Sequence, residues 1–280
     1  MCDGPIAVFD SGLGGLSVVR QLRHLLPHEQ IVYFGDTARV PYGTKSQPTV
    51  VQFALETAGF LLQFEPKLIV AACNTASALA LDELMQALPV PVIGVVEPGA
   101  RAAVRRADGA PIAVLGTEAT IASGAYWRAI RAVRPTQAVI SRACPLFVPL
   151  VEEGRDSDHP LVRLAVATYL GDLPSQGVRV VVLGCTHYPL LRPAIAELLG
   201  PDVQIVDSGR ETSLVVQQHL AARAALSGRR APGTLRCYVS DNPERFQRLG
   251  SRFLNEAIEQ VEFVEPERYV NLARQAGRRP

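Results

Sequence analysis

The feature that most constrains the fold of this 280-residue chain is a regular alternation of short apolar runs with longer amphipathic segments. Short apolar runs predict buried β-strands, and apolar residues spaced three or four apart predict helices. Strands and helices in alternation are typical of a parallel sheet covered by helices, so we predict the α/β class. The predicted strands are residues 6–9, 31–34, 68–72, 92–95, 112–115, 138–141, 179–183, 204–206 and 235–239, and the predicted helices include residues 47–64, 77–88, 100–107, 120–133, 160–170, 189–199, 211–226 and 243–253.

The second half of the chain repeats the first half faintly. The sequence Pro-Ile-Ala-Val occurs at residues 5–8 and again at residues 111–114, at a predicted strand in each case. Later in each half, a buried strand ends in a cysteine, Cys73 or Cys185, that polar residues follow. Unrelated strands would explain the identities equally well, but the matching cysteines favour a repeat. We expect two similar α/β units, joined near residues 97–99.

Composition argues against several classes of partner. The 28 Lys and Arg residues nearly balance the 27 Asp and Glu residues, so no basic surface for nucleic acid is expected. The short basic pairs at 229–230 and 278–279 are interpreted as solvated surface. No apolar run reaches the roughly 20 residues of a membrane-spanning helix, and the first residues lack a signal-peptide pattern. We expect a cytoplasmic protein that binds neither membrane nor nucleic acid.

The cysteines divide into two groups. Their odd number and the lack of a Cys-x-x-Cys pair argue against a disulfide framework and against a metal site. Buried cysteines are usually small packing residues, and we interpret Cys2, Cys144 and Cys237 in this way. Cys73 and Cys185 differ because polar residues follow them where packing would prefer apolar ones. These two are therefore candidates for chemistry.

Polar clusters at the ends of the predicted strands indicate an acid–base site. Ligands of open α/β sheets bind beyond the carboxyl ends of the strands, which is where Asp10, Cys73, Cys185 and His187 are expected. A helix start at each cysteine would favour the thiolate and lower the thiol pKa below its usual value of about 8.5. Two thiols on facing units can address opposite faces of one carbon. That geometry is the one that inversion of a stereocentre needs.

The neighbouring groups suit an amino-acid substrate. The hydroxyl and amide groups of Ser11, Asn74, Thr75 and Thr186 can hold a carboxylate and an ammonium group. The backbone N–H groups at residues 42–43 and at the helix starts can bind further carboxylate oxygens. These groups and the two thiols together predict proton transfer at an amino acid.

A dinucleotide-binding fold is one rival interpretation. Residues 12–15 read Gly-Leu-Gly-Gly after a strand, and Asp36 follows at about the expected distance. However, Ser17 occupies the third glycine position. Asp10 also puts a carboxylate where a pyrophosphate would lie, which is a repulsive arrangement.

A pyridoxal enzyme is a weaker rival. It needs a lysine that forms a Schiff base. The chain offers only Lys45, in a predicted turn, and Lys67, at a predicted helix–strand connection. Neither position suits that role, and no cofactor is expected.

At these motifs the sequence resembles the glutamate racemases of the aspartate/glutamate racemase superfamily. The combination is specific, and the motifs follow the family's order along most of the chain. The run Gly-Asp-Thr-Ala-Arg-x-Pro-Tyr-Gly separates this branch from aspartate racemases. The matching segments are residues 9–16, 35–43, 72–77, 96–99 and 184–190.

The resemblance implies a fold, a reaction and a biological role. The fold would be two α/β domains with the active site in the cleft, the first comprising residues 1–97 plus 208–280 and the second residues 98–207. The protein would interconvert L- and D-glutamate without a cofactor, supply D-glutamate for bacterial peptidoglycan and form a homodimer. A racemase for aspartate or another amino acid of the same superfamily is the alternative.

The resemblance also implies residue roles. Cys73 would take the α-proton from D-glutamate, and Cys185 would take it from L-glutamate. Asp10 and His187 would assist their respective cysteines, with Glu152 near His187. The implied substrate contacts are Asp10, Ser11, Pro41, Tyr42, Gly43, Asn74, Thr75, Thr117, Thr120, Thr186 and His187.

Overall fold

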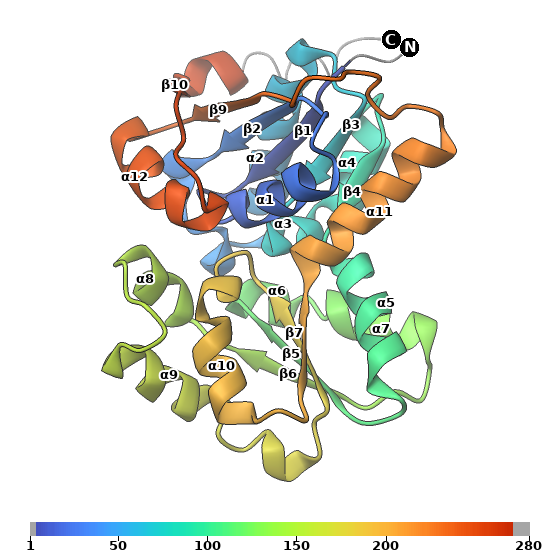
Figure 1. Ribbon diagram of the computed structural model, residues 1–280, viewed down its shortest axis with the longest axis vertical. Helices are drawn as coiled ribbons and strands as arrows, with labels where there is room; N and C mark the ends of the chain where they lie inside the picture. The colour runs from blue at the N-terminus through green and yellow to red at the C-terminus, as the bar shows by residue number, and fades with distance from the viewer. Residues whose placement is uncertain (1–3, 271–280) are drawn as a thin grey trace.

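Two parallel β-sheets, one above the other in Figure 1, organise the computed structural model, which describes residues 4–270. The first sheet has the strand order β10-β9-β2-β1-β3-β4, and the second has the order β6-β5-β7-β8. Every neighbouring pair of strands is parallel. The strands are β1 Ile6–Asp10, β2 Ile31–Gly35, β3 Leu68–Ala71, β4 Val92–Gly94, β5 Ile112–Gly116, β6 Val139–Ala143, β7 Val180–Gly184, β8 Gln204–Asp207, β9 Leu235–Val239 and β10 Val261–Phe263.

The strand order itself repeats. The order β2-β1-β3-β4 in the first sheet matches β6-β5-β7-β8 in the second. Ile6 of β1 pairs with Leu68 of β3, and Ile112 of β5 pairs with Val180 of β7. Cys73 and Cys185 follow β3 and β7, which are corresponding strands. The predicted fold class, two similar parallel-sheet α/β domains, is confirmed.

The chain crosses from one sheet to the other twice. Helix α5 (Val96–Ala107) leads from β4 of the first sheet to β5 of the second. Helix α11 (Ser208–Ala222) leads from β8 back toward β9, and it packs against both α5 and α1 (Leu16–Leu25). Figure 1 shows α11 in orange, rising from the lower sheet to the upper one. The domain limits expected after residues 97 and 207 fall at the starts of these two helices and stay predictions.

Two predicted helices are interrupted. The one predicted at residues 77–88 is two helices, α3 (Asn74–Leu79) and α4 (Leu81–Ala87), and α3 starts directly after Cys73. The one predicted at 120–133 breaks at Gly124, whose φ of +66° is the left-handed conformation that favours glycine. The break separates α6 (Glu118–Ala122) from α7 (Ala125–Val133). The remaining helices are α2 Gln47–Leu61, α8 Phe147–Glu152, α9 Pro160–Leu170, α10 Arg192–Leu199 and α12 Pro243–Leu254.

A hydrophobic core connects the two sheets. The side chains of the central strands β1, β2, β3, β5 and β7 are buried on both faces, as expected for parallel sheets covered by helices, whereas β6 and β10 are partly exposed. One cluster of buried residues includes Val8 and Val70 of the first sheet together with Leu115 and Val181 of the second. Burial of one such side chain contributes about 1.5–3 kcal/mol. The shared core therefore holds the carboxyl ends of the two sheets against each other.

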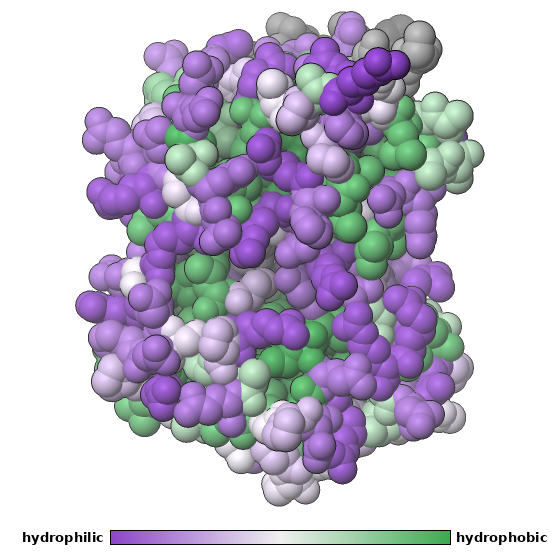
Figure 2. Space-filling view, in the orientation of Figure 1, coloured by the Kyte–Doolittle hydropathy of each residue, from purple (hydrophilic) through white to green (hydrophobic). Residues whose placement is uncertain are grey.

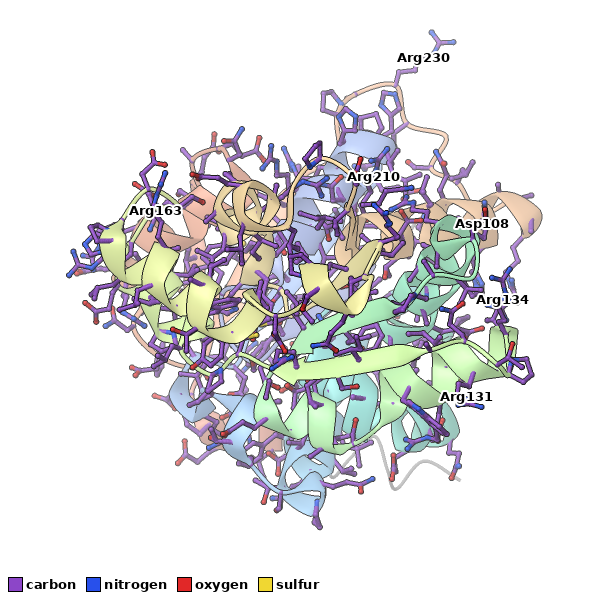
Figure 3. All side chains as sticks on the ribbon, turned by 90° about the horizontal axis from the view of Figure 1, so that it is seen from below. Asp108, Arg131, Arg134, Arg163, Arg210 and Arg230 are labelled. Atoms are coloured by element: carbon purple, nitrogen blue, oxygen red, sulfur yellow. The ribbon has the colours of Figure 1, made fainter. Side chains whose placement is uncertain are left out.

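Charged and polar side chains cover the outside. Figure 2 shows hydrophilic residues over most of one face, with smaller hydrophobic patches between them. Seen from below, Arg131, Arg163 and Arg230 point outward (Figure 3), and the pair at 229–230 is exposed as predicted. The pair at 278–279 and Cys2 lie outside the described residues. Within residues 4–270, no helix combines the length and apolarity needed to cross a membrane, and no cluster of His, Cys, Asp or Glu could hold a metal ion.

A buried ion pair anchors the returning chain to the first sheet. Lys67 Nζ lies 2.6 Å from Glu29 Oε2, with the two side chains only 2% and 3% exposed. Lys67 also donates to the carbonyl of Ala225 at 2.8 Å, and the Ser227 N–H donates to Glu29 Oε1 at 2.7 Å. The Lys67 amine is thus fully engaged at the end of the sheet opposite the cysteines. It is not placed to form a Schiff base there.

Removing one partner of this pair leaves the other charge buried without compensation. We expect Lys67→Met to lower the free energy of unfolding by about 3–5 kcal/mol, measured by urea denaturation. The double variant Lys67→Met/Glu29→Gln removes both charges, and its new amide oxygen can still accept from the Ser227 N–H. It should therefore recover most of the loss. Equal losses in the single and double variants would contradict the ion-pair account.

Candidate active site

The ends of β3 and β7 open into one cavity between the two sheets. Its volume is about 30 Å³, room for a few water molecules at most. Any amino acid needs more space, so the walls have to part to admit one. The cavity is lined by Ser11, Gly12, Val40, Pro41, Tyr42, Gly43, Cys73, Asn74, Thr75, Thr117, Val148, Glu152, Cys185, Thr186 and His187.

Cys73 approaches the cavity from the first sheet. It precedes α3 in an extended conformation, is 5% exposed, and donates from Sγ to Ser11 Oγ at 3.6 Å. Burial raises the pKa of the Cys73 thiol to about 12, and the nearby Asp10 carboxyl adds to this. The expected lowering of this pKa by the helix start is therefore wrong. The helix has only six residues, and desolvation of the thiolate outweighs its dipole.

Cys185 approaches the cavity from the second sheet. Its Sγ lies 3.9 Å from Nδ1 of His187. The other ring nitrogen of His187, Nε2, lies 3.1 Å from Glu152 Oε1. Arg245 of α12 donates to Glu152 Oε2 at 3.3 Å. A chain of polar contacts thus runs from the thiol through the imidazole and the carboxylate to a guanidinium of the first domain.

His187 and Glu152 form an ion pair. Burial lowers the pKa of His187, but its hydrogen bonds to Cys185 and Glu152 outweigh burial and raise the pKa to about 10. Burial raises the pKa of Glu152, while His187 and Arg245 lower it, and the net change is downward. At neutral pH the imidazole is therefore protonated and the carboxyl is ionised. This positive charge lies directly beside Cys185.

Asp10 lies beneath the cavity rather than in its lining. It is fully buried, accepts from the Gly12 N–H at 3.0 Å, and accepts from Thr186 Oγ1 at 3.4 Å. Burial raises its pKa, and the His187 charge acts in the opposite direction. The sequence-based interpretation placed Asp10 beside Cys73. One of its hydrogen bonds reaches Thr186 on the Cys185 side, while its carboxyl acts on Cys73 through charge.

Three threonines join the two sides of the cavity. Thr75 Oγ1 of α3 lies 3.0 Å from Thr117 Oγ1 and 3.1 Å from Thr120 Oγ1. Thr117 caps α6 and also donates to Thr120 at 2.9 Å. Thr75 and Thr117 line the cavity, whereas Thr120 is 1% exposed behind them. Thr120 therefore supports the wall rather than facing a ligand.

The glycine turn of the rival nucleotide interpretation is covered by the second domain. A Cβ on Gly14 would lie 2.3 Å from Thr186 Oγ1 and 2.6 Å from His187 Cε1. The carbonyl of Gly12 accepts from the Tyr33 hydroxyl at 2.9 Å. The turn thus packs against catalytic candidates and leaves no room for a pyrophosphate.

Several site residues were not predicted. Val40 and Val148 line the cavity with apolar groups, and Val148 lies on α8, a short helix without a periodic pattern. Arg245 contacts Glu152 from 93 positions away along the chain. Such a pair leaves no local sequence signal. The Gly-Asp-Thr-Ala-Arg-Val-Pro motif at 35–41 did indicate the segment that contains Val40.

The family model for Asp/Glu/Hydantoin racemase matches residues 16–213, which is well over half of the chain. The chain belongs to this family. A glutamate racemase from Geobacter metallireducens is 50% identical over 89% of this chain and 92% of its own length. The resemblance to glutamate racemases is therefore confirmed.

Solved structures of this racemase family share the fold. A glutamate racemase isoform from Bacillus anthracis superimposes with a TM-score of 0.91 at 38% identity, covering 95% of this chain and 99% of its own. A glutamate racemase from Francisella tularensis in complex with D-glutamate gives a TM-score of 0.88 at 39% identity, covering 95% and 98%. Both matches extend over the two α/β domains.

Gly14 tests the contact between the domains. We expect Gly14→Ala to destabilise this racemase by about 1–3 kcal/mol because the new methyl group displaces Thr186 and His187. The matched change Gly228→Ala, at an exposed position with open space around it, should stay within about 0.5 kcal/mol. Thermal unfolding measures both. Equal midpoints for the two variants would contradict the close packing.

The His187–Glu152 pair predicts a pH dependence. The stabilisation from His187 is fully present below its unfolded pKa of about 6.5 and is lost as the pH rises through about 10. The contribution of Glu152, whose pKa is lowered, is present above about pH 4.3 and is lost as the pH falls through its folded-state pKa.

Nuclear magnetic resonance of the imidazole C–H signals checks the same pair. Glu152→Gln should lower the His187 pKa from about 10, since it removes the negative charge of Glu152 while the Cys185 contact stays. The adjacent exposed change, Glu153→Gln, should leave it in place. A wild-type His187 that titrates near 6.5 would overturn the assigned ion pair.

Proposed function

We propose that this chain is a glutamate racemase that interconverts L- and D-glutamate with two cysteine bases and no cofactor. The observation that carries the proposal is that Cys73 and Cys185, at corresponding strand ends of two repeated sheets, line one cavity. The 50% identity with a glutamate racemase supports the choice of substrate. So does the D-glutamate bound to the related Francisella enzyme.

In the proposed reaction the thiolate of Cys185 removes the α-proton of L-glutamate. The electron pair of the broken C–H bond passes into the α-carboxylate, and the thiol of Cys73 then gives its proton to the opposite face of Cα. Cys185 ends as a thiol and Cys73 as a thiolate, which is the state that accepts D-glutamate. The reverse reaction follows the same path with the two cysteines exchanged.

The electrostatics suit this division of roles. The raised pKa of Cys73 keeps it protonated in the free enzyme, ready to donate. The protonated His187 stabilises a thiolate on Cys185, and Glu152 holds the imidazole in position. We assign Asp10 to the Cys73 side because its negative charge disfavours the Cys73 thiolate. This charge helps to keep the Cys73 thiol protonated in the free enzyme.

The substrate groups find matching partners in the proposed complex. Ser11 suits the ammonium group, which the buried Asp10 carboxyl would attract from behind the cavity wall, and Asn74, Thr75, Thr117 and Thr186 suit the carboxylates. Backbone N–H groups near Pro41, Tyr42 and Gly43 suit the side-chain carboxylate. The remaining expected contacts, Thr120 and His187, act through Thr117 and Cys185. A closed cavity keeps water away from the carbanion, so that only the two thiols exchange protons with Cα.

The proposal extends to the biological role. We infer that the product D-glutamate serves peptidoglycan synthesis and that the enzyme works in the cytoplasm, where both thiols stay reduced. We further infer a homodimer, as the family resemblance implies. A racemase for aspartate or another amino acid remains the alternative, and comparing turnover of L-glutamate and L-aspartate decides between them.

Turnover of L-glutamate by the purified protein, with no added cofactor, tests the activity. Circular dichroism should decay to zero as the two enantiomers equilibrate, while the α-proton signal disappears in D2O. A protein that remains inactive after its thiols have been reduced would overturn the proposal. Activity only after addition of pyridoxal phosphate would overturn the cofactor-free mechanism.

The two cysteines should be individually essential. We expect Cys73→Ser and Cys185→Ser each to lower kcat at least about a hundredfold because each removes one proton-transfer group. Cys237→Ser, a buried cysteine in β9 away from the cavity, is the matched control and should keep most of its turnover. Near-normal turnover in either site variant would contradict the two-base mechanism.

A further inference from the structure

Tyr126 of α7 lies beside the segment where the chain crosses from one domain to the other. Its side chain is 2% exposed. A Cβ on Gly99 of α5 would lie 3.4 Å from the tyrosine ring and 3.2 Å from Ser208, the first residue of α11. A Cβ on Gly184, the residue before Cys185, would lie 3.1 Å from the same ring. The ring thus packs against α5 and against the strand end that carries Cys185.

The hydroxyl group of Tyr126 reaches the other half of the active site. It donates to Oδ1 of Asn74 at 2.7 Å, and Asn74 directly follows Cys73. Burial raises the pKa of Tyr126, so the hydroxyl keeps its proton and acts as the donor. One side chain therefore touches the strand end of Cys185 and the residue next to Cys73.

The hydrogen bond fixes which way the Asn74 amide faces. With Oδ1 accepting from Tyr126, the amide nitrogen Nδ2 must point elsewhere. Asn74 is 2% exposed and lines the cavity, and Nδ2 has no hydrogen-bond partner among the described residues. A buried amide nitrogen without a partner is costly unless a ligand accepts its hydrogen bond. The free donor therefore indicates an acceptor on the substrate.

We propose that Tyr126 is a positioning residue that turns the Asn74 amide so that Nδ2 donates to a substrate carboxylate. This inference rests on the proposed racemase activity. Without the tyrosine hydroxyl, the amide can rotate by 180° and present Oδ1, which repels a carboxylate. Tyr126 also makes this orientation depend on the closed arrangement, because its ring is held by the second domain and its hydroxyl by the first.

Tyr126→Phe removes only the hydroxyl, so the ring packing is kept. We expect kcat/KM for L-glutamate to fall about tenfold, with most of the loss in KM because the carboxylate is bound before the proton moves. Tyr188→Phe is the matched control. It also removes a buried hydroxyl, which donates to the Cys144 carbonyl at 3.0 Å, but it leaves the amide of Asn74 untouched.

A double-mutant cycle separates positioning from general packing. If Tyr126 acts through Asn74, Tyr126→Phe should change kcat/KM less than about twofold in an Asn74→Ala background. An equal cost in both backgrounds, or no cost in the wild-type background, would overturn this inference. It would leave the proposed function intact as long as the wild type racemises glutamate.

The side-chain amide signals of Asn74 give a readout besides activity. Tyr126→Phe should shift these signals while the backbone amide signals of the distant β9 stay in place. A wild-type protein that does not turn over glutamate would contradict the proposed function. The Asn74 signals would still decide the inference, since unchanged signals contradict the hydrogen bond that orients the amide.

Discussion

Parallel strands bring their carboxyl ends to one edge of a sheet, and in this molecule two such edges face each other. The strand order of the second sheet repeats that of four adjacent strands of the first, so the corresponding strands β3 and β7 deliver one cysteine each to the same cavity. The shared hydrophobic core and the threonine contacts hold the edges together. The proposed two-base reaction depends on this arrangement, because neither sheet alone can present groups to both faces of a carbon.

The two halves of the site are similar in backbone and different in charge. The Cys73 thiol, from the first sheet, is buried and lies near the Asp10 carboxyl. Both burial and this carboxyl favour the neutral thiol. The thiol from the second sheet faces His187. Burial lowers the pKa of His187, but its contacts with Cys185 and with Glu152 on the far side outweigh burial and raise that pKa. A symmetric chain fold thus yields an asymmetric pair of proton-transfer groups. In the proposed reaction this asymmetry would suit one cysteine to donate a proton and the other to accept one, as a proton relay through Cα requires.

The strand pattern, the repeat and both cysteines were predictable, because each depends on local periodicity or on residues adjacent in sequence. The contacts that tune the site were not. Arg245 meets Glu152, and Tyr126 meets Asn74, across long stretches of chain that carry no shared pattern. The pKa of Cys73 was predicted in the wrong direction because the sequence shows the helix start but not the burial that outweighs it. Short elements such as α8 and β10 were missed, since a few residues cannot establish a period.

A mechanism with two opposed thiols predicts an isotope pattern that a mechanism with a single base does not. Starting from L-glutamate in D2O, the first D-glutamate formed should carry deuterium at Cα while the remaining L-glutamate keeps its proton. The reason is that, in the proposed reaction, Cys185 removes the proton and Cys73, already exchanged with solvent, supplies the deuteron. Mass spectrometry of the separated enantiomers at less than a tenth of full conversion measures this directly. Deuterium appearing equally early in both enantiomers would contradict the account, because one base would then be serving both faces.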